Sequence, residues 1–166
     1  MTARRITWME GAVAFAIGGS LLAVSVPAFV REVHASRLTE ALEGVSSLSA
    51  ACVAHAAGRP TASAFPPSVP LTPATPPRGV KELDPPGTWS HPSWVALAFR
   101  AAPDGVPHAF AYALDTSLGA EHSTFVARAR GDLDGDGQLS SFEARGAARG
   151  GHGSREPGLY VEAELE

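Results

Sequence analysis

The sequence predicts an α+β protein in which a long N-terminal helix, membrane-spanning over its first part, packs on a small antiparallel β-sheet. Three observations predict this class: an uncharged stretch near the N-terminus, a following segment whose apolar residues recur every three or four positions, and C-terminal segments in which apolar residues alternate. The 166 residues suffice for one modest domain with an appendage and exclude a large multidomain enzyme.

The uncharged stretch covers residues 11–30. Twenty helical residues at about 1.5 Å each span roughly 30 Å, which is the thickness of the hydrocarbon layer of a bilayer. Arg4 and Arg5 precede the stretch and favour a cytoplasmic N-terminus, so that the rest of the chain lies outside the membrane. A secretory signal peptide is the alternative interpretation, although the apolar run is longer than its usual core.

Residues 31–57 have the spacing of an amphipathic helix that continues the membrane segment. Its apolar stripe consists of Leu38, Leu42, Val45, Leu48 and Cys52. Gly58 and Pro60 end the helix, because glycine commonly caps a helix and proline cannot continue it. The sequence therefore predicts one long helix over residues 6–57.

Residues 58–92 form a Pro-rich connector. Ten of the fourteen prolines fall within it. Proline has no amide hydrogen and restricts the residue before it, which favours an extended, irregular segment. A ligand for an SH3-type domain is the alternative interpretation of the same composition.

Residues 93–166 form a β-rich head, in which alternating apolar residues predict a small antiparallel sheet of three or four short strands. The strands are expected at residues 94–99, 108–114, 123–129 and 159–163, with a glycine-rich loop over 146–154. A sheet of this size needs a partner for its apolar face. The leucine-containing stripe of the long helix is the available partner.

The N-terminus carries a motif that resembles the start of a type IV pilin or type II secretion pseudopilin. The motif is Ile6-Thr7-Trp8-Met9-Glu10, followed by an uncharged helix and by Pro27-Ala28-Phe29. The resemblance implies a structural subunit of a pilus or pseudopilus, with other such subunits as homo- or hetero-oligomeric partners. It places the chain in a bacterial inner membrane with the head outside, or in an extracellular pilus.

Glu10 and Pro27 are the expected assembly residues. A carboxylate at the edge of a membrane helix is costly unless it is paired or lies near the interface, which makes Glu10 a functional candidate. In the family that the motif resembles, this glutamate pairs with the N-terminal amine of a neighbouring subunit. Pro27 removes a backbone hydrogen bond and is expected to kink or locally melt the helix.

Residues 1–5 form a short basic segment that resembles a leader peptide, with a processing site between Arg5 and Ile6. The family's prepilin peptidase normally cuts after glycine, whereas this chain has a long charged side chain at that position. Processing by this peptidase is therefore an open question. The alternative function is an unprocessed, monomeric, membrane-anchored calcium-binding module that does not assemble.

An acidic loop over residues 132–143 has the spacing of an EF-hand-type calcium loop. Aspartates occupy its first, third and fifth positions, glycine the sixth and glutamate the twelfth. The expected Ca²⁺ ligands are Asp132, Asp134, Asp136, the Gln138 carbonyl, Ser140 and Glu143. The preceding segment alternates like a strand, so we expect a structural staple and no calcium-sensor motion. An acidic Asp-Gly turn without metal is the alternative.

Charge and residue types exclude other classes. Thirteen basic residues against seventeen acidic ones give a net charge of −4, and no basic stripe exists for nucleic acid. The six histidines have no metal-ligand spacing, and no nucleophile stands in a motif with a base. We therefore expect no enzymatic activity. Cys52 is the single cysteine, so an intrachain disulfide is impossible.

Overall fold

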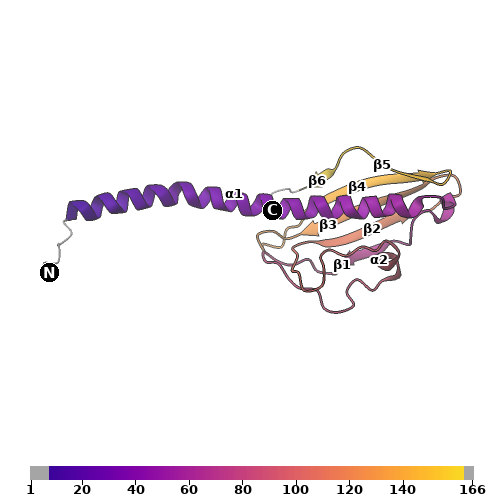
Figure 1. Cartoon of the computed structure of the whole chain (residues 1–166), viewed down its shortest axis with the longest axis horizontal. Coiled ribbons are helices and arrows are strands. Elements are labelled where there is room, and N and C mark those ends of the chain that lie inside the picture. The colour runs from indigo at the N-terminus through magenta and orange to yellow at the C-terminus, as the bar shows by residue number, and fades with distance from the viewer. Residues whose placement is uncertain (1–7, 163–166) are drawn as a thin grey trace. The chain divides into compact units, whose positions relative to one another are not determined.

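The computed structural model describes residues 8–162, and within them the side chains outside residues 27–37. The predicted leader-like segment and its processing site at Arg5 and Ile6 lie outside the described residues. The chain divides into two units, Met1–Ser36 and Arg37–Glu166. Helix α1 (Trp8–Ala56) contributes residues to both, and the second unit also contains an antiparallel sheet, so the predicted α+β class is confirmed (Figure 1).

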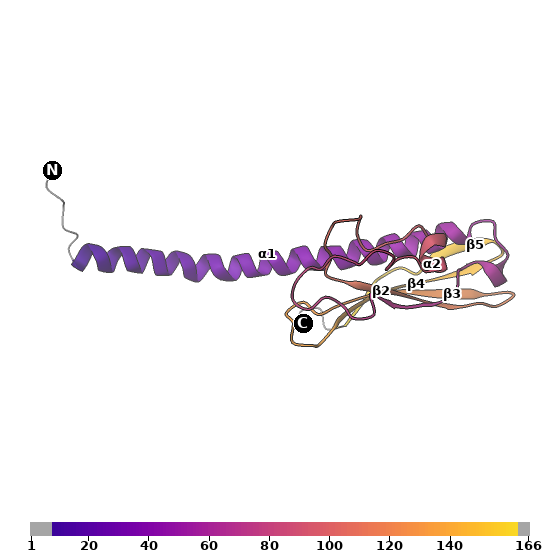
Figure 2. The ribbon, with the colours of Figure 1, turned by 90° about the horizontal axis from the view of Figure 1, so that it is seen from below.

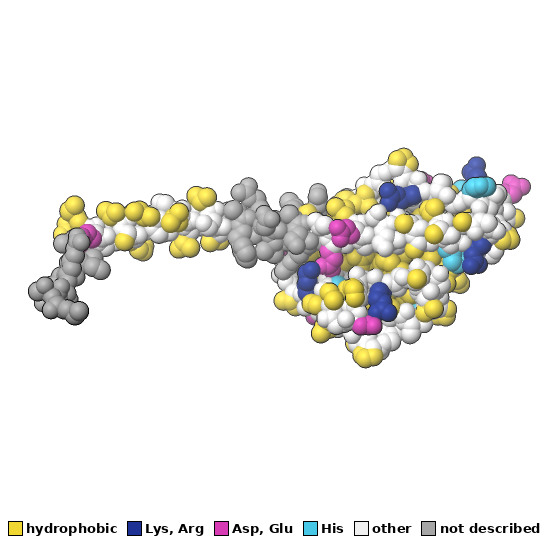
Figure 3. All heavy atoms as spheres, viewed as in Figure 1, with side chains coloured by type: hydrophobic (Ala, Val, Ile, Leu, Met, Phe, Trp, Pro, Cys, Tyr) yellow, Lys and Arg dark blue, Asp and Glu magenta, His cyan; other side chains and the backbone are white. Residues whose placement is uncertain are grey.

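The described part of the first unit is helical. Its side chains from Trp8 to Val26 are mostly exposed, and large apolar ones cover its surface (Figure 3). This segment is long and apolar enough to cross a membrane. Helix α1 is assigned through Pro27 without a break, so no local melting is seen at the proline.

Within the second unit, α1 lies against one face of the sheet (Figures 1 and 2). The apolar residues that it buries completely are Ala41, Val45, Leu48, Cys52 and Ala56. The predicted stripe is therefore wrong at Leu42, which is 42% exposed. Small Ala41 replaces it, because positions 41, 45, 48 and 52 follow one line along the helix.

In the described residues, six strands form one sheet. Their bounds are Val69–Thr72 (β1), Ala111–Ser117 (β2), Ser123–Gly131 (β3), Ser140–Arg149 (β4), His152–Arg155 (β5) and Tyr160–Glu162 (β6). The order is β1-β2-β3-β4-β5, with β6 also paired to β4, and all pairs are antiparallel. Every second residue of β3 is buried, which confirms the predicted alternation over residues 123–129.

The predicted strand over residues 94–99 is wrong, because its first part is helix α2 (Pro92–Ala96). Pro92 suits a first helical turn, and His91 caps the helix by accepting a hydrogen bond from the Ser93 N–H, with N and Nδ1 3.2 Å apart. Ala98, with φ at 49°, turns the chain after the helix. Trp94 and Phe99 are buried in spite of the different backbone, so an alternating pattern misidentified the element.

The predicted loop over 146–154 is also wrong, since it forms the end of β4, a turn and β5. Gly150 and Gly151, with φ of 55° and 78°, make the turn, as expected for a two-residue hairpin. Gly146 leaves room for the ring of Phe125, which a Cβ there would overlap. Gly146 thus allows close packing against Phe125, and Gly150 and Gly151 form the turn.

Two further differences concern strand positions. The strand expected at residues 108–114 begins only at Ala111 and continues to Ser117. Strand β1 and a short 3-10 helix, η1 (Thr61–Ser63), lie within the Pro-rich connector, which also buries Phe65 and Val69. The last predicted strand is present as β6.

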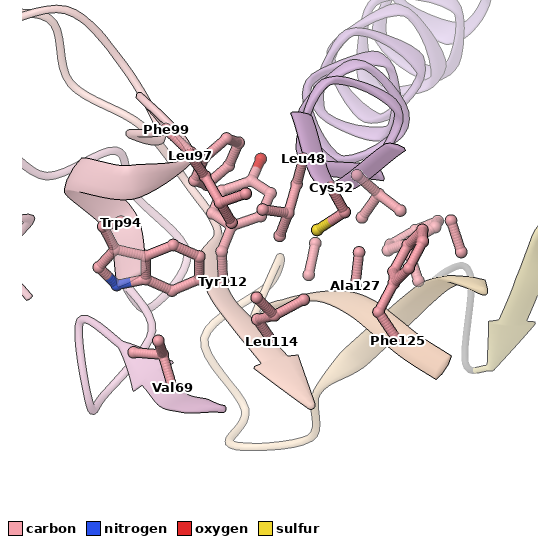
Figure 4. Close-up of a cluster of buried hydrophobic side chains, with 14 of the residues drawn as sticks. Leu48, Cys52, Val69, Trp94, Leu97, Phe99, Tyr112, Leu114, Phe125 and Ala127 are labelled. Carbon is pink, nitrogen blue, oxygen red and sulfur yellow. The ribbon is translucent and has the colours of Figure 1, made fainter. Parts of the chain in front are cut away.

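The core of the second unit lies between α1, the sheet and α2 (Figure 4). Leu48 and Cys52 of α1 face the side chains of β2 and β3 (Figure 4). The aromatic rings pack mainly edge to face, as Phe65 and Phe125 do with centroids 5.0 Å apart. This core fixes β3 and β4, and therefore the loop that joins them.

Candidate functional site

The loop between β3 and β4 gathers three carboxylates. Asp132, Asp134 and Asp136 each offer an oxygen, and these oxygens lie within 4.8 Å of one another. Asp132 is buried, at 3% exposure, whereas Asp134 and Asp136 face solvent. This cluster could hold a metal ion.

Asp132 organises the loop from its base. Its Oδ1 accepts the Gly135 N–H at 2.7 Å, and its Oδ2 accepts the Gly137 N–H at 3.1 Å. Both glycines have positive φ, 87° and 96°, in the left-handed region that favours glycine. The loop therefore folds back over Asp132 through residues that tolerate the required turn.

The exposed part of the loop follows the same pattern. Asp134 Oδ1 accepts the Asp136 N–H at 3.0 Å, and Asp136 Oδ1 accepts the Gln138 N–H at 2.7 Å. The Gln138 side chain donates a further hydrogen bond to Asp136 Oδ2 at 3.0 Å. The side-chain and main-chain hydrogen bonds from Gln138 lower the pKa of Asp136, so this carboxyl group is ionised at neutral pH.

Glu143 is not brought to the cluster. It lies in β4 opposite Arg128, whose Nε is 2.5 Å from its Oε1, and Arg145 Nη2 is 3.2 Å from its Oε2. Burial alone would raise its pKa, but the hydrogen bonds and charges of the two arginines outweigh burial and lower it. Both carboxylate oxygens thus have arginine partners.

The cause of this placement is the element that follows the loop. A helix would turn the twelfth residue back toward the ion, whereas a strand moves each residue about 3.3 Å farther along. Ser140, opposite Gly131, is the first residue of that strand and is fully buried. The structure therefore brings together the three aspartates, joins Gln138 to Asp136, and pairs Glu143 with arginines instead.

One contact of the loop could not be predicted from the acidic motif, because its partner lies in the Pro-rich segment. The Gly79 N–H donates to the Asp132 carbonyl oxygen at 2.8 Å, and Arg78 forms a β-bridge with Asp132. A Cβ at Gly79 would lie 3.2 Å from the Asp134 carbonyl oxygen, and φ there is 66°. A glycine within a proline-rich segment was the only available hint.

The second candidate site is the apolar segment of the first unit. Glu10 lies in the first turn of α1 and is exposed among apolar side chains. The segment Trp8–Val26 could be a membrane anchor or a signal sequence. The side chain of Pro27 lies outside the described residues.

Comparison of the chain with protein-family models, with curated proteins and with solved structures gives no match.

Proposed function

We propose that this chain is a pilin-like structural subunit of a type IV pilus or secretion pseudopilus, with a calcium-stabilised head. The observation that carries this proposal is the change in the exposure of apolar side chains along α1. Residues 8–26 expose large apolar side chains, including Trp8 at 84% and Phe15 at 83%. Residues 41–56, in contrast, bury one line of apolar side chains against the sheet, which we call the helix seam. Apolar surface of this kind is stable only when lipid or neighbouring helices cover it.

The presence of Glu10 in this apolar segment supports a role of the segment in assembly. A carboxylate within a membrane helix is expensive and is retained mainly where it has a function. In the pilins that the Ile6–Glu10 motif resembles, the glutamate pairs with the amine of a neighbouring subunit and sets the register between helices. We assign the same role to Glu10.

Small residues in the same segment favour close helix packing. A Cβ added at Gly11, Gly18 or Gly19 would meet no atom within 4 Å. Glycines on a membrane helix allow the backbone of a second helix to approach closely. These positions give a neighbouring subunit room to pack.

Calcium is the metal that suits the aspartate cluster best. All candidate ligands are oxygens, and Ca²⁺ accepts six to eight of them in irregular geometry, whereas Mg²⁺ prefers a tight octahedron. We assign Asp132, Asp134, Asp136 and the Gln138 carbonyl as protein ligands, with water filling the remaining positions. The ion would offset the repulsion between the carboxylates and brace the β3–β4 connection in a domain without disulfides.

A second candidate function rests on Arg5, which stands directly before Ile6. A peptidase site shaped for glycine would exclude its long charged side chain. The chain would then remain an unprocessed membrane anchor that carries a calcium-binding head and does not polymerise.

The two candidates separate in a bacterium that carries type IV assembly machinery. The full chain is compared with Glu10→Ala and with Glu43→Ala, which removes an exposed carboxylate elsewhere on α1. We expect the full chain and Glu43→Ala in filaments or high-mass membrane complexes, with Glu10→Ala left as single membrane-bound chains. A monomeric full chain would favour the anchored module, and unimpaired assembly of Glu10→Ala would remove the role given to Glu10.

A further inference from the structure

His108 is a buried titratable side chain that the proposed function does not use. Its side chain is only 3% exposed, and both ring nitrogens face polar atoms. Nδ1 lies 2.8 Å from the Phe110 carbonyl oxygen, and Nε2 lies 2.7 Å from Asp84 Oδ2. The ring thus joins the segment just before β2 to a residue 24 positions earlier.

The partners of the ring determine where its protons lie. A carbonyl oxygen only accepts hydrogen bonds, so Nδ1 carries a hydrogen. Asp84 Oδ2 also accepts the Trp89 indole N–H, at 2.5 Å, and an ionised carboxylate has no proton to donate. With Asp84 ionised, the contact requires a hydrogen on Nε2 as well, and this arrangement gives the ring a positive charge.

The contact fastens a strap, which we define as residues 81–90. At one end of the strap Lys81 Nζ lies 2.6 Å from Glu40 Oε2, and the backbones of Glu82 and His108 exchange two hydrogen bonds of 3.0 Å. At the other end Trp89 packs against the rings of Trp94, Phe99, Tyr112 and His108. The Asp84–His108 contact lies between these ends.

Asp84 and Trp89 of the strap also line an open concavity of about 560 Å³, whose other wall is the loop over residues 100–106. Its volume falls within the range of small-ligand sites. Movement of the strap would change the width of this concavity.

Charged and titratable groups from three elements surround the ring. The strap contributes Asp84, with its side chain 17% exposed, together with Glu82 and Lys81; helix α1 contributes Glu40, and β2 contributes Tyr112. Lys81 is bound to Glu40. Burial and the charge of Glu40 raise the pKa of Tyr112, which keeps this phenol neutral.

We propose that the Asp84–His108 contact is a protonation-dependent latch that holds the strap over the second unit. The latch is closed while both ring nitrogens carry hydrogens. When Nε2 loses its proton to water, its lone pair faces the carboxylate and the two groups repel each other. Asp84 then moves away and takes the Trp89 indole with it, while the backbone pair at Glu82 and the Lys81–Glu40 bridge remain.

The test follows the three tryptophan indole N–H signals of the ¹⁵N-labelled full chain in detergent micelles. The signals are recorded from about pH 5 to about pH 9, across the range in which histidine changes its charge. Trp89→Phe and Trp8→Phe assign the signals of Trp89 and of Trp8, which serves as the internal reference. We expect the Trp89 signal to shift in a single step while the Trp8 signal stays in place.

Two variants decide the cause of the step. Asp84→Asn has the same shape, but its amide can donate to the unprotonated Nε2, so the step should disappear. Glu82→Gln neutralises a neighbouring carboxylate of the strap and should keep the step. A Trp89 signal that does not move in the full chain, a step that persists in Asp84→Asn, or a step that disappears in Glu82→Gln would each overturn the latch.

Discussion

The carboxylate of Glu40 accepts a hydrogen bond from the backbone N–H of Ala109, with Oε1 and N 2.6 Å apart and 69 positions between them in the sequence. The other oxygen of the same carboxylate is 2.6 Å from Lys81 Nζ. The Tyr112 hydroxyl donates to the Glu40 carbonyl oxygen at 3.3 Å. One residue of α1 therefore holds the start of β2 and the Pro-rich segment together.

Replacing Glu40 tests this junction. Glu40→Ala leaves the Ala109 N–H without its acceptor and should lower the free energy of unfolding by about 1–3 kcal/mol. Glu40→Gln keeps an acceptor and should cost less. The free energies come from urea unfolding of the full chain in detergent micelles, with the exposed Glu43→Ala as the control. Equal stability of Glu40→Ala and Glu43→Ala would contradict the junction.

Gly44 is a second test of how α1 packs. A Cβ at this position would overlap the ring of Tyr112. Alanine favours a helix over glycine by about 1 kcal/mol, yet Gly44→Ala should destabilise the second unit because packing outweighs propensity. Gly18→Ala, where a Cβ meets no atom within 4 Å, should leave the unfolding of the second unit unchanged. A Gly44→Ala protein more stable than the parent would show that α1 does not approach β2 in this way.

Calcium binding tests whether Glu143 belongs to the ligand set, as the sequence motif predicts, or lies outside it, as its arginine partners indicate. Titration calorimetry of the full chain with Ca²⁺ should show one site, with a Kd of about 0.1–1 mM, the range of weak calcium modules. Asp134→Ala should abolish the heat. Glu143→Gln should retain binding, because Glu143 has arginine partners, whereas a complete EF-hand loop would lose affinity. No heat from the unmodified chain would refute the calcium site, and loss of binding in Glu143→Gln would return this residue to the ligand set.

The Glu143 pair also predicts an effect of pH on stability. The lowered pKa of Glu143 means that its ionised form is favoured in the folded state. Its contribution is therefore complete above the ordinary glutamate pKa of about 4.3 and is lost as the pH falls through the lowered folded value. Acid unfolding followed in calcium-free buffer should show a shallower loss of stability in Glu143→Gln. An unchanged acid profile would contradict the prediction.

Cys52 provides a chemical probe of the helix seam. Burial raises the pKa of its thiol to about 12, and its side chain is fully covered in the structure. Only the thiolate reacts with iodoacetamide, so the folded chain should remain unmodified at about pH 8 and react after denaturation. Mass spectrometry measures the added group. Rapid modification of the folded chain would place Cys52 outside the seam.

Some patterns in this sequence identify the element that forms, and others identify only which residues are buried. The spacing of Val45, Leu48 and Cys52 predicted the buried helix face. The same pattern included Leu42, which is exposed, and missed the buried Ala41, because a leucine dominates an apolar pattern more than an alanine does. Alternation predicted β3 but misidentified α2, because Pro92 and His91 start a helix that the apolar pattern does not record.

At the candidate site, too, the sequence predicted the local contacts but not those that depend on the fold. The spacing of aspartates and glycines predicted the cluster of Asp132, Asp134 and Asp136, because these contacts are local in sequence. Glu143 was assigned from the position of a ligand in a loop that leads into a helix. Here the loop leads into β4, and the cross-strand partner Arg128 lies where only the register of the sheet could place it.

The most direct test of the central claim is the N-terminal residue and intact mass of the chain extracted from the membranes of its native host. A membrane-anchored subunit must keep residues 11–30. A pilin-like subunit predicts a mature chain that begins at Ile6. A chain that still begins at Met1 would favour the second candidate function, an unprocessed membrane anchor that does not polymerise. A chain that begins after Val30 and is recovered without membranes would contradict both, because the apolar segment would then be a removed signal sequence.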